Sequence, residues 1–152
     1  MKLRIAPPVL TFLSAILMWA IANYLTFATM DIDLSWRKSI FLVFVALGCA
    51  AAFAAFFNFR SSKTTIDPMK PEKASVLVTE GIFQFTRNPM YLGLLSCLIA
   101  WAIYLNNFLT LLVVVGFFFY MTQVQIKAEE KALNEKFGED YQAYMQRVRR
   151  WL

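Results

Sequence analysis

The chain has 152 residues, of which 59% are hydrophobic and 16% aromatic, and its formal net charge is +5. Soluble domains are usually about 45–50% apolar, and a domain of this length leaves much of its surface exposed. The apolar residues must therefore contact something other than water, and lipid is the obvious candidate. The absence of histidine and the presence of only two cysteines without a Cys-x-x-Cys spacing argue against a zinc site, a haem site or a site with a histidine base.

The first half of the sequence predicts two transmembrane helices, at residues 8–30 and 39–59. Both ranges lie in stretches without Asp, Glu, Lys or Arg, and one helical crossing of a bilayer needs about 20 residues. A signal peptide is the alternative for the first range, because Lys2 and Arg4 precede it. We favour a helix, since the apolar run is longer than the roughly 7–15 residues of a signal core and has no convincing cleavage site.

Residues 88–126 form a third stretch without charged side chains. As a single helix this stretch would be about 58 Å long at ~1.5 Å per residue, which matches two short crossings. Asn106 and Asn107 lie near its middle, and adjacent asparagines favour turns. We therefore expect a hairpin with helices at 89–105 and 108–126, and a re-entrant hairpin is the alternative.

Small side chains in the second predicted helix indicate close helix packing. Gly48, Ala52 and Ala55 are spaced so that another helix can approach closely in lipid. Cys49 and Cys97 both fall inside predicted helices, without a Cys-x-x-Cys spacing, and we interpret them as reduced packing residues.

The basic residues predict the orientation in the membrane. Of the 15 lysines and arginines, 13 precede the first helix, lie in the 60–88 loop or follow the fourth helix. The positive-inside rule places this face, and both chain ends, in the cytosol. Attraction to anionic lipids explains the positive charge without a nucleic-acid partner. We expect an all-α, polytopic protein with a single membrane domain over 1–152, in a bacterial inner membrane.

The segment 127–152 is expected to be a cytosolic, amphipathic helical segment. Gly138 is expected to divide it into two pieces, and the segment either lies on the bilayer or covers the site described below as a lid. Its apolar residues recur with helical period: Leu133, Phe137, Tyr141, Tyr144, Val148 and Trp151.

Two polar clusters are expected to meet at the cytosolic face. Residues 86–93 enter the third helix and residues 127–131 leave the fourth, so an antiparallel hairpin places them side by side. Pro89 at the first helical position leaves free amide donors beside Arg87, which suits a carboxylate. Glu129 and Glu130 suit an ammonium group or ribose hydroxyls. Because adjacent helical residues point about 100° apart, we expect one glutamate in the site and the other on lysine or solvent.

Tyr91 and Gly93 add an aromatic face and a place for close backbone approach. The place where residues 86–93 and 127–131 meet, which we call the corner, therefore matches a zwitterion that carries a flat ring and a sugar. The alternative is a structural one, in which the arginine and proline form a helix cap at the membrane interface and the two glutamates form a solvated face.

These motifs resemble the isoprenylcysteine carboxyl methyltransferase and phospholipid methyltransferase superfamily. The resemblance covers roughly residues 66–152, including Pro68-Met69-Lys70-Pro71 and Thr79-Glu80-Gly81. It rests mainly on the run Arg-Asn-Pro-Met-Tyr-Leu-Gly at 87–93, followed by Glu129 and Glu130, and then by Leu133, Phe137, Gly138, Tyr141, Tyr144 and Val148.

The resemblance implies an integral membrane methyltransferase that uses S-adenosylmethionine on a lipophilic substrate, either a prenylcysteine-like carboxylate or a phospholipid amine. It implies that Arg87 and Glu130 are catalytic and that Tyr141 and Tyr144 contact the substrate. Its cofactor-binding candidates are Arg87, Asn88, Pro89, Tyr91, Gly93, Glu129 and Glu130.

Asn88 departs from the family pattern, because many members have histidine at this place. Asparagine keeps a donor and an acceptor but does not titrate near neutral pH, so a mechanism with a base here is in doubt. This departure supports the alternative of a non-catalytic membrane protein that retains the fold. A small transporter ranks last, because no ionisable group lies inside the four predicted spans. The methyl acceptor and the oligomeric state stay open.

Overall fold

The computed structural model describes residues 5–61 and 75–152 of the chain, and every regular element in these ranges is helical. The expected all-α class is confirmed. Lys2, Arg4, Lys63, Lys70, Lys73 and the Pro68–Pro71 motif lie outside the described residues. The elements are α1 (Pro7–Tyr24), α2 (Leu34–Ser61), the 3-10 turn η2 (Gly81–Gln84), α3 (Pro89–Leu105), α4 (Thr110–Tyr120), the π-helical turn η3 (Met121–Ile126) and α5 (Lys127–Arg147).

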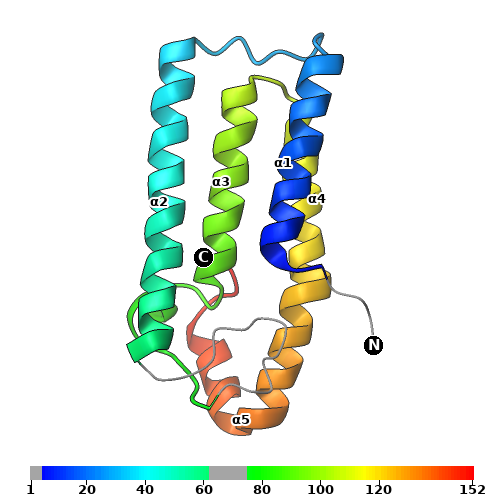
Figure 1. The fold of residues 1–152 in the computed structure, drawn as a ribbon. Coiled ribbons are helices and arrows are strands. Elements are labelled where there is room, and N and C mark those ends of the chain that lie inside the picture. Colours follow the sequence, from blue (N-terminus) through cyan, green and yellow to red (C-terminus); the bar gives the residue numbers. More distant parts are fainter. Residues whose placement is uncertain (1–4, 62–74) are drawn as a thin grey trace.

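The outer surface of the helix bundle is strongly apolar. Among the described residues, three helices are long and apolar enough to cross a membrane: α1, α2 and the continuous helix from Thr110 to Arg147. α3 is apolar but shorter. α3 occupies the centre of the bundle, with α2 on one side and α1 and α4 on the other (Figure 1). Large side chains on the outer helices are at least half exposed, which fits contact with lipid: Phe12, Trp19, Phe53, Phe57, Leu112 and Phe119.

α2 and α3 form the most extensive helix contact, and two glycines set their separation. An ideal Cβ on Gly48 would lie 2.7 Å from the Gly93 carbonyl oxygen, and one on Gly93 would lie 2.6 Å from the Gly48 carbonyl oxygen. Ser96 adds a hydrogen bond from its hydroxyl to the Phe44 carbonyl at 2.8 Å. The expected packing role of Gly48 is therefore confirmed, and its partner is the glycine at the fifth position of α3.

The turn expected at Asn106 and Asn107 is present, and Asn106 has the left-handed conformation (φ 58°). It pairs with the α1–α2 connection: the Met30 N–H donates to the Asn106 carbonyl at 3.1 Å. The Asn107 amide donates to the Leu25 carbonyl at 2.7 Å. The expected extension of the first helix to residue 30 is wrong, because the backbone after Tyr24 bonds to this turn instead of continuing the helix.

The second helix begins earlier than the expected residue 39. α2 starts at Leu34, where the Asp33 carboxylate accepts the N–H of Ser35 at 2.8 Å. A carboxylate in this place satisfies an amide that has no partner in the first helical turn, and these backbone hydrogen bonds lower the Asp33 pKa. The helix therefore begins before the apolar run and includes the charged residues Arg37 and Lys38.

The fourth helix starts at Thr110 and does not end at the expected residue 126. It continues through η3 into α5 as far as Arg147, and residues 148–152 are not helical. Inside α5, Gly138 has φ 51° and ψ −122°, which interrupts the helix and divides the segment into two pieces, as expected. Figure 1 shows α5 folding back below the bundle, so that the chain end lies beside the start of α3.

Gly93→Ala should lower the stability of the bundle. Its new methyl group would meet the backbone oxygen of Gly48, so the two helices would have to separate, and overpacking of this kind costs about 1–3 kcal/mol. Gly116→Ala in α4 is the matched control, because its Cβ would meet nothing within 4 Å. Thermal unfolding midpoints measured in one detergent test this expectation. Equal midpoints for the two variants would contradict it.

Gly138→Ala should also destabilise the fold, although its Cβ would have open space around it. The reason is the backbone conformation, which L-residues rarely adopt and which costs about 1–3 kcal/mol. Gly138→Asn should be equally harmful, because asparagine tolerates left-handed helical backbone but not a ψ near −122°. Glu139→Ala, on the exposed neighbour, is the control. Chemical denaturation of the three variants measures the difference, and a wild-type midpoint for Gly138→Ala would refute it.

Candidate functional site

The entry of α3 is shaped by a proline and by a bend that a hydroxyl stabilises. Pro89 occupies the first helical position, where a missing N–H leaves no bond unmade. The Thr86 hydroxyl accepts the Asn88 N–H at 3.2 Å. The Asn88 side chain does not cap its own helix, and its amide donates instead to the Arg150 carbonyl at 2.9 Å.

The expected meeting of the two polar clusters is found, with Glu130 at its centre. Arg87 Nη2 lies 3.0 Å from Glu130 Oε1. Arg150 binds the same carboxylate in a bidentate manner: its Nε donates to Oε1 at 2.8 Å and its Nη2 donates to Oε2 at 2.7 Å. The Arg87 and Glu130 side chains are 9% and 13% exposed, so this ion pair is largely shielded from water. Its hydrogen bonds to Glu130 raise the pKa of Arg150.

Arg87 retains unused hydrogen-bonding capacity. Within the part of the chain that the structure describes, its Nε and Nη1 atoms are buried without a hydrogen bond of ordinary geometry, and the Tyr141 phenol lies near the guanidinium. Buried polar groups of native proteins nearly always have partners. Two guanidinium groups and one carboxylate also leave the cluster with one net positive charge. Arg87 is thus suited to bind a further anion.

Glu129 belongs to a second network. The Tyr91 hydroxyl donates to Glu129 Oε1 at 2.5 Å, and the Gln125 amide donates to the same oxygen. Gln125 lies in η3 and is buried, and π-helical turns are frequent at functional sites. Both glutamates thus have partners inside the protein. The expected pairing of one of them with lysine or solvent stays a prediction.

Tyr141 and Tyr144 lie beneath this corner, on the part of α5 that follows Gly138. Burial raises the pKa of Tyr141 to about 12, although the nearby Arg87 opposes this. Burial also raises the pKa of Tyr144, whose hydroxyl donates to the Phe83 carbonyl at 2.7 Å. Both phenols stay protonated near neutral pH, so neither removes a positive charge from the site or acts as a base.

The two remaining candidates, Pro89 and Gly93, lie in different places: Pro89 is at the corner, and Gly93 is in the contact between α2 and α3. Pro89 is buried at the start of α3. Gly93 faces Gly48 on α2, so the α2–α3 contact accounts for the absence of a side chain there. A role of Gly93 at a cofactor stays a prediction.

Arg150 and Gln125 are contacts of this site that were not among the sequence candidates. Arg150 is one of three arginines in residues 147–150, and no local pattern distinguishes it from the others. Gln125 lies four residues before Glu129, and this spacing in a helix could have predicted the contact between their side chains.

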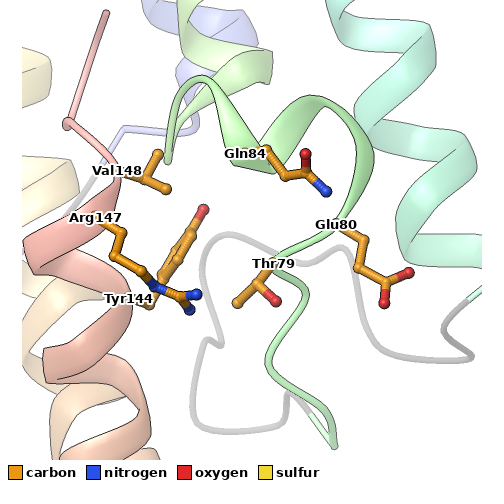
Figure 2. Close-up of a pocket in the computed structure, with 6 residues that line it drawn as sticks. All are labelled: Thr79, Glu80, Gln84, Tyr144, Arg147 and Val148. Atoms are coloured by element: carbon orange, nitrogen blue, oxygen red, sulfur yellow. The ribbon is translucent and has the colours of Figure 1, made fainter.

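A separate cavity of about 350 Å³ lies between the η2 segment and the end of α5. Figure 2 shows Arg147, Tyr144 and Val148 on one wall, with Thr79, Glu80 and Gln84 on the other. Of the sequence candidates, only Tyr144 lines this cavity, so the cavity is distinct from the corner around Glu130.

Comparison with known proteins gives both a family and relatives. The protein-S-isoprenylcysteine O-methyltransferase B of Arabidopsis thaliana is 32% identical over 116 residues, which are 74% of this chain and 57% of the relative. The protein-S-isoprenylcysteine O-methyltransferase of Schizosaccharomyces pombe is 29% identical over 107 residues, which are 70% of this chain and 45% of the relative. The chain thus spans about half the length of these two methyltransferases.

A protein of Haemophilus influenzae, whose name assigns no activity, is 49% identical over 63 residues, which are 41% of this chain and all of that protein. The phospholipid methyltransferase family model matches residues 36–140, which include α3, η3 and both glutamates of the corner. The expected resemblance is confirmed, and the chain belongs to the phospholipid methyltransferase family.

Proposed function

We propose that this protein is an S-adenosylmethionine-dependent methyltransferase that acts on a lipophilic substrate at the cytosolic face of a membrane. The observation that carries the proposal is the buried Arg87 guanidinium, which has one carboxylate partner and two nitrogens without a hydrogen bond of ordinary geometry among the described residues. The family membership and the names of two relatives, both protein-S-isoprenylcysteine O-methyltransferases, support the same reaction class.

The residues of the corner fit this cofactor chemically. The Nε and Nη1 nitrogens of Arg87 suit a carboxylate, and the open start of α3 adds positive dipole character. Glu129 suits an ammonium group or ribose hydroxyls, and Tyr91 would hold that carboxylate in place through its hydroxyl. Asn88 and Pro89 shape the entry of α3. Arg87 and Glu129 would hold the cofactor, and Tyr91, Asn88 and Pro89 would support them.

The sulfonium of the bound cofactor supplies an already activated methyl group, so the protein needs little acid–base chemistry. Its residues must orient the two reactants and exclude water. A carboxylate acceptor needs no base, and an amine acceptor needs only its neutral form, which a site of low polarity favours. The protonated phenols of Tyr141 and Tyr144 agree with this demand, and we propose that they contact the substrate. Glu130 would keep Arg87 in position.

We further propose a single membrane domain with four crossings, with the α5 end of the bundle in the cytosol of a bacterial cell. The apolar surfaces of α1, α2 and α4 support the membrane placement. The positions of the basic residues in the sequence support the orientation.

Calorimetric titration of the purified protein in detergent with S-adenosylmethionine should show binding at one site. Glu129→Gln should weaken this binding about 10- to 100-fold, which corresponds to roughly 1.5–3 kcal/mol for a hydrogen bond to a charged group. Glu135→Gln is the matched control, since this glutamate lies on the same helix in an exposed pair with Lys131. A folded protein that binds no cofactor would favour a non-catalytic member of the fold, which the departure at Asn88 also suggests.

Deletion of the gene should remove one methylated species from the lipid-soluble extract of the cells. Loss of an isoprenoid ester would identify a carboxylate acceptor, and loss of an N-methylated phospholipid would identify an amine acceptor. Mass spectrometry of extracts from the deletion strain, and from a strain complemented with the Glu129→Gln variant, measures this. Identical lipid-soluble extracts with and without the gene would count against a lipophilic substrate.

A further inference from the structure

Residues 148–152 run from the end of α5 across the corner to the start of α3. The backbone is extended at Val148, and the Arg87 N–H donates to the Arg149 carbonyl at 3.0 Å. The Arg150 carbonyl accepts the Asn88 amide at 2.9 Å and the Thr86 hydroxyl at 3.4 Å. The residues just before Pro89 therefore hold this segment by three hydrogen bonds, two of which come from side chains.

The side chains of the same segment reach the opposite side of the corner. Arg150 makes its two hydrogen bonds to Glu130 on α5. Trp151 donates its indole N–H to the Thr122 hydroxyl in η3 at 3.1 Å, and its ring centroid lies 5.0 Å from that of Phe118. Residues 148–152, which we call the clasp, thus connect the start of α3 with α4, η3 and α5.

The clasp affects whether Arg87 can bind an anion. Glu130 carries one negative charge, and Arg150 occupies both of its oxygens. Arg87 contacts Glu130 through a single nitrogen and keeps two buried nitrogens without a hydrogen bond of ordinary geometry in the described part of the chain. Without Arg150, the carboxylate would be neutralised by Arg87 alone, and a second carboxylate would have to compete with it. Arg150 thereby preserves the positive charge that an anionic ligand needs.

We propose that Asn88 is a positioning residue that fastens the clasp, so that Arg150 stays on Glu130 and Arg87 can bind the carboxylate of the methyl donor. This inference rests on the proposed function for its ligand. It gives Asn88 a task that requires only an N–H donor directed at a carbonyl, and no titration. Asn88 acts through the clasp rather than by touching the ligand.

A double-mutant cycle on Asn88 and Arg150 tests the proposal by S-adenosylmethionine titration of the full chain in detergent. Asn88→Ala should weaken binding about 3- to 10-fold, the equivalent of one neutral hydrogen bond. Arg150→Ala should weaken it about 10-fold or more. The double variant should bind no more weakly than Arg150→Ala, because both changes act through one contact. Asn88→His, which keeps an N–H donor, should retain binding.

Arg149→Ala is the matched control, because Arg149 is exposed and contributes only its backbone carbonyl to the clasp. It removes the same charge from the neighbouring position and should leave binding within about twofold. Weakening by Arg149→Ala equal to that by Arg150→Ala would show a general charge effect. Losses from Asn88→Ala and Arg150→Ala that multiply in the double variant would show that the two residues act independently of each other. Either result overturns the proposal.

Hydrogen exchange without any ligand gives an independent readout. The Arg87 amide is bonded to the clasp, so Asn88→Ala and the isosteric Asn88→Asp should speed exchange in peptides that cover 86–88 and 148–152. Arg149→Ala should not. Unchanged exchange in both Asn88 variants would refute the clasp. Faster exchange in a protein that binds no S-adenosylmethionine would refute the proposed function and leave the fastening role of Asn88 in place.

Discussion

One carboxylate, that of Glu130, joins the parts of this protein that form its polar corner. It is held by Arg87 from the start of α3 and by Arg150 from the segment after α5. Removing such ions from water is costly unless their geometry and hydrogen bonds compensate for it, and loss of one partner leaves an uncompensated buried charge. The corner therefore depends on three chain segments being placed together, and none of them can form it alone.

Two backbone features bring these segments together. The reversal at Gly138 turns the second half of α5 back toward the bundle, which places Tyr141 and Tyr144 beneath the corner. The π-helical turn η3 brings Gln125 and Thr122 inside, where they contact Glu129 and Trp151. Glu129 and Glu130 can thus serve two separate networks, although they are adjacent in the chain.

The helix bundle has a different task from that of the corner. Its outer surface is apolar and suits lipid, whereas the close contact of Gly48 with Gly93 keeps α3 central and fixed against α2. Since α3 begins directly at Pro89, the position of this helix determines where Arg87, Asn88 and Tyr91 lie. A membrane-embedded packing contact therefore positions the polar groups at one end of the bundle.

The sequence alone determined the helical class, the start of α3 at Pro89, the turn at Asn106 and the meeting of Arg87 with the glutamate pair. These follow from the lengths of the charge-free runs, from local backbone chemistry and from the antiparallel return of a hairpin. Only the tertiary structure decided the end of α1 at Tyr24, because the partners of that connection lie about 80 residues later. It also decided the role of Arg150, which depends on the reversal at Gly138 and on hydrogen bonds to residues more than 60 positions away.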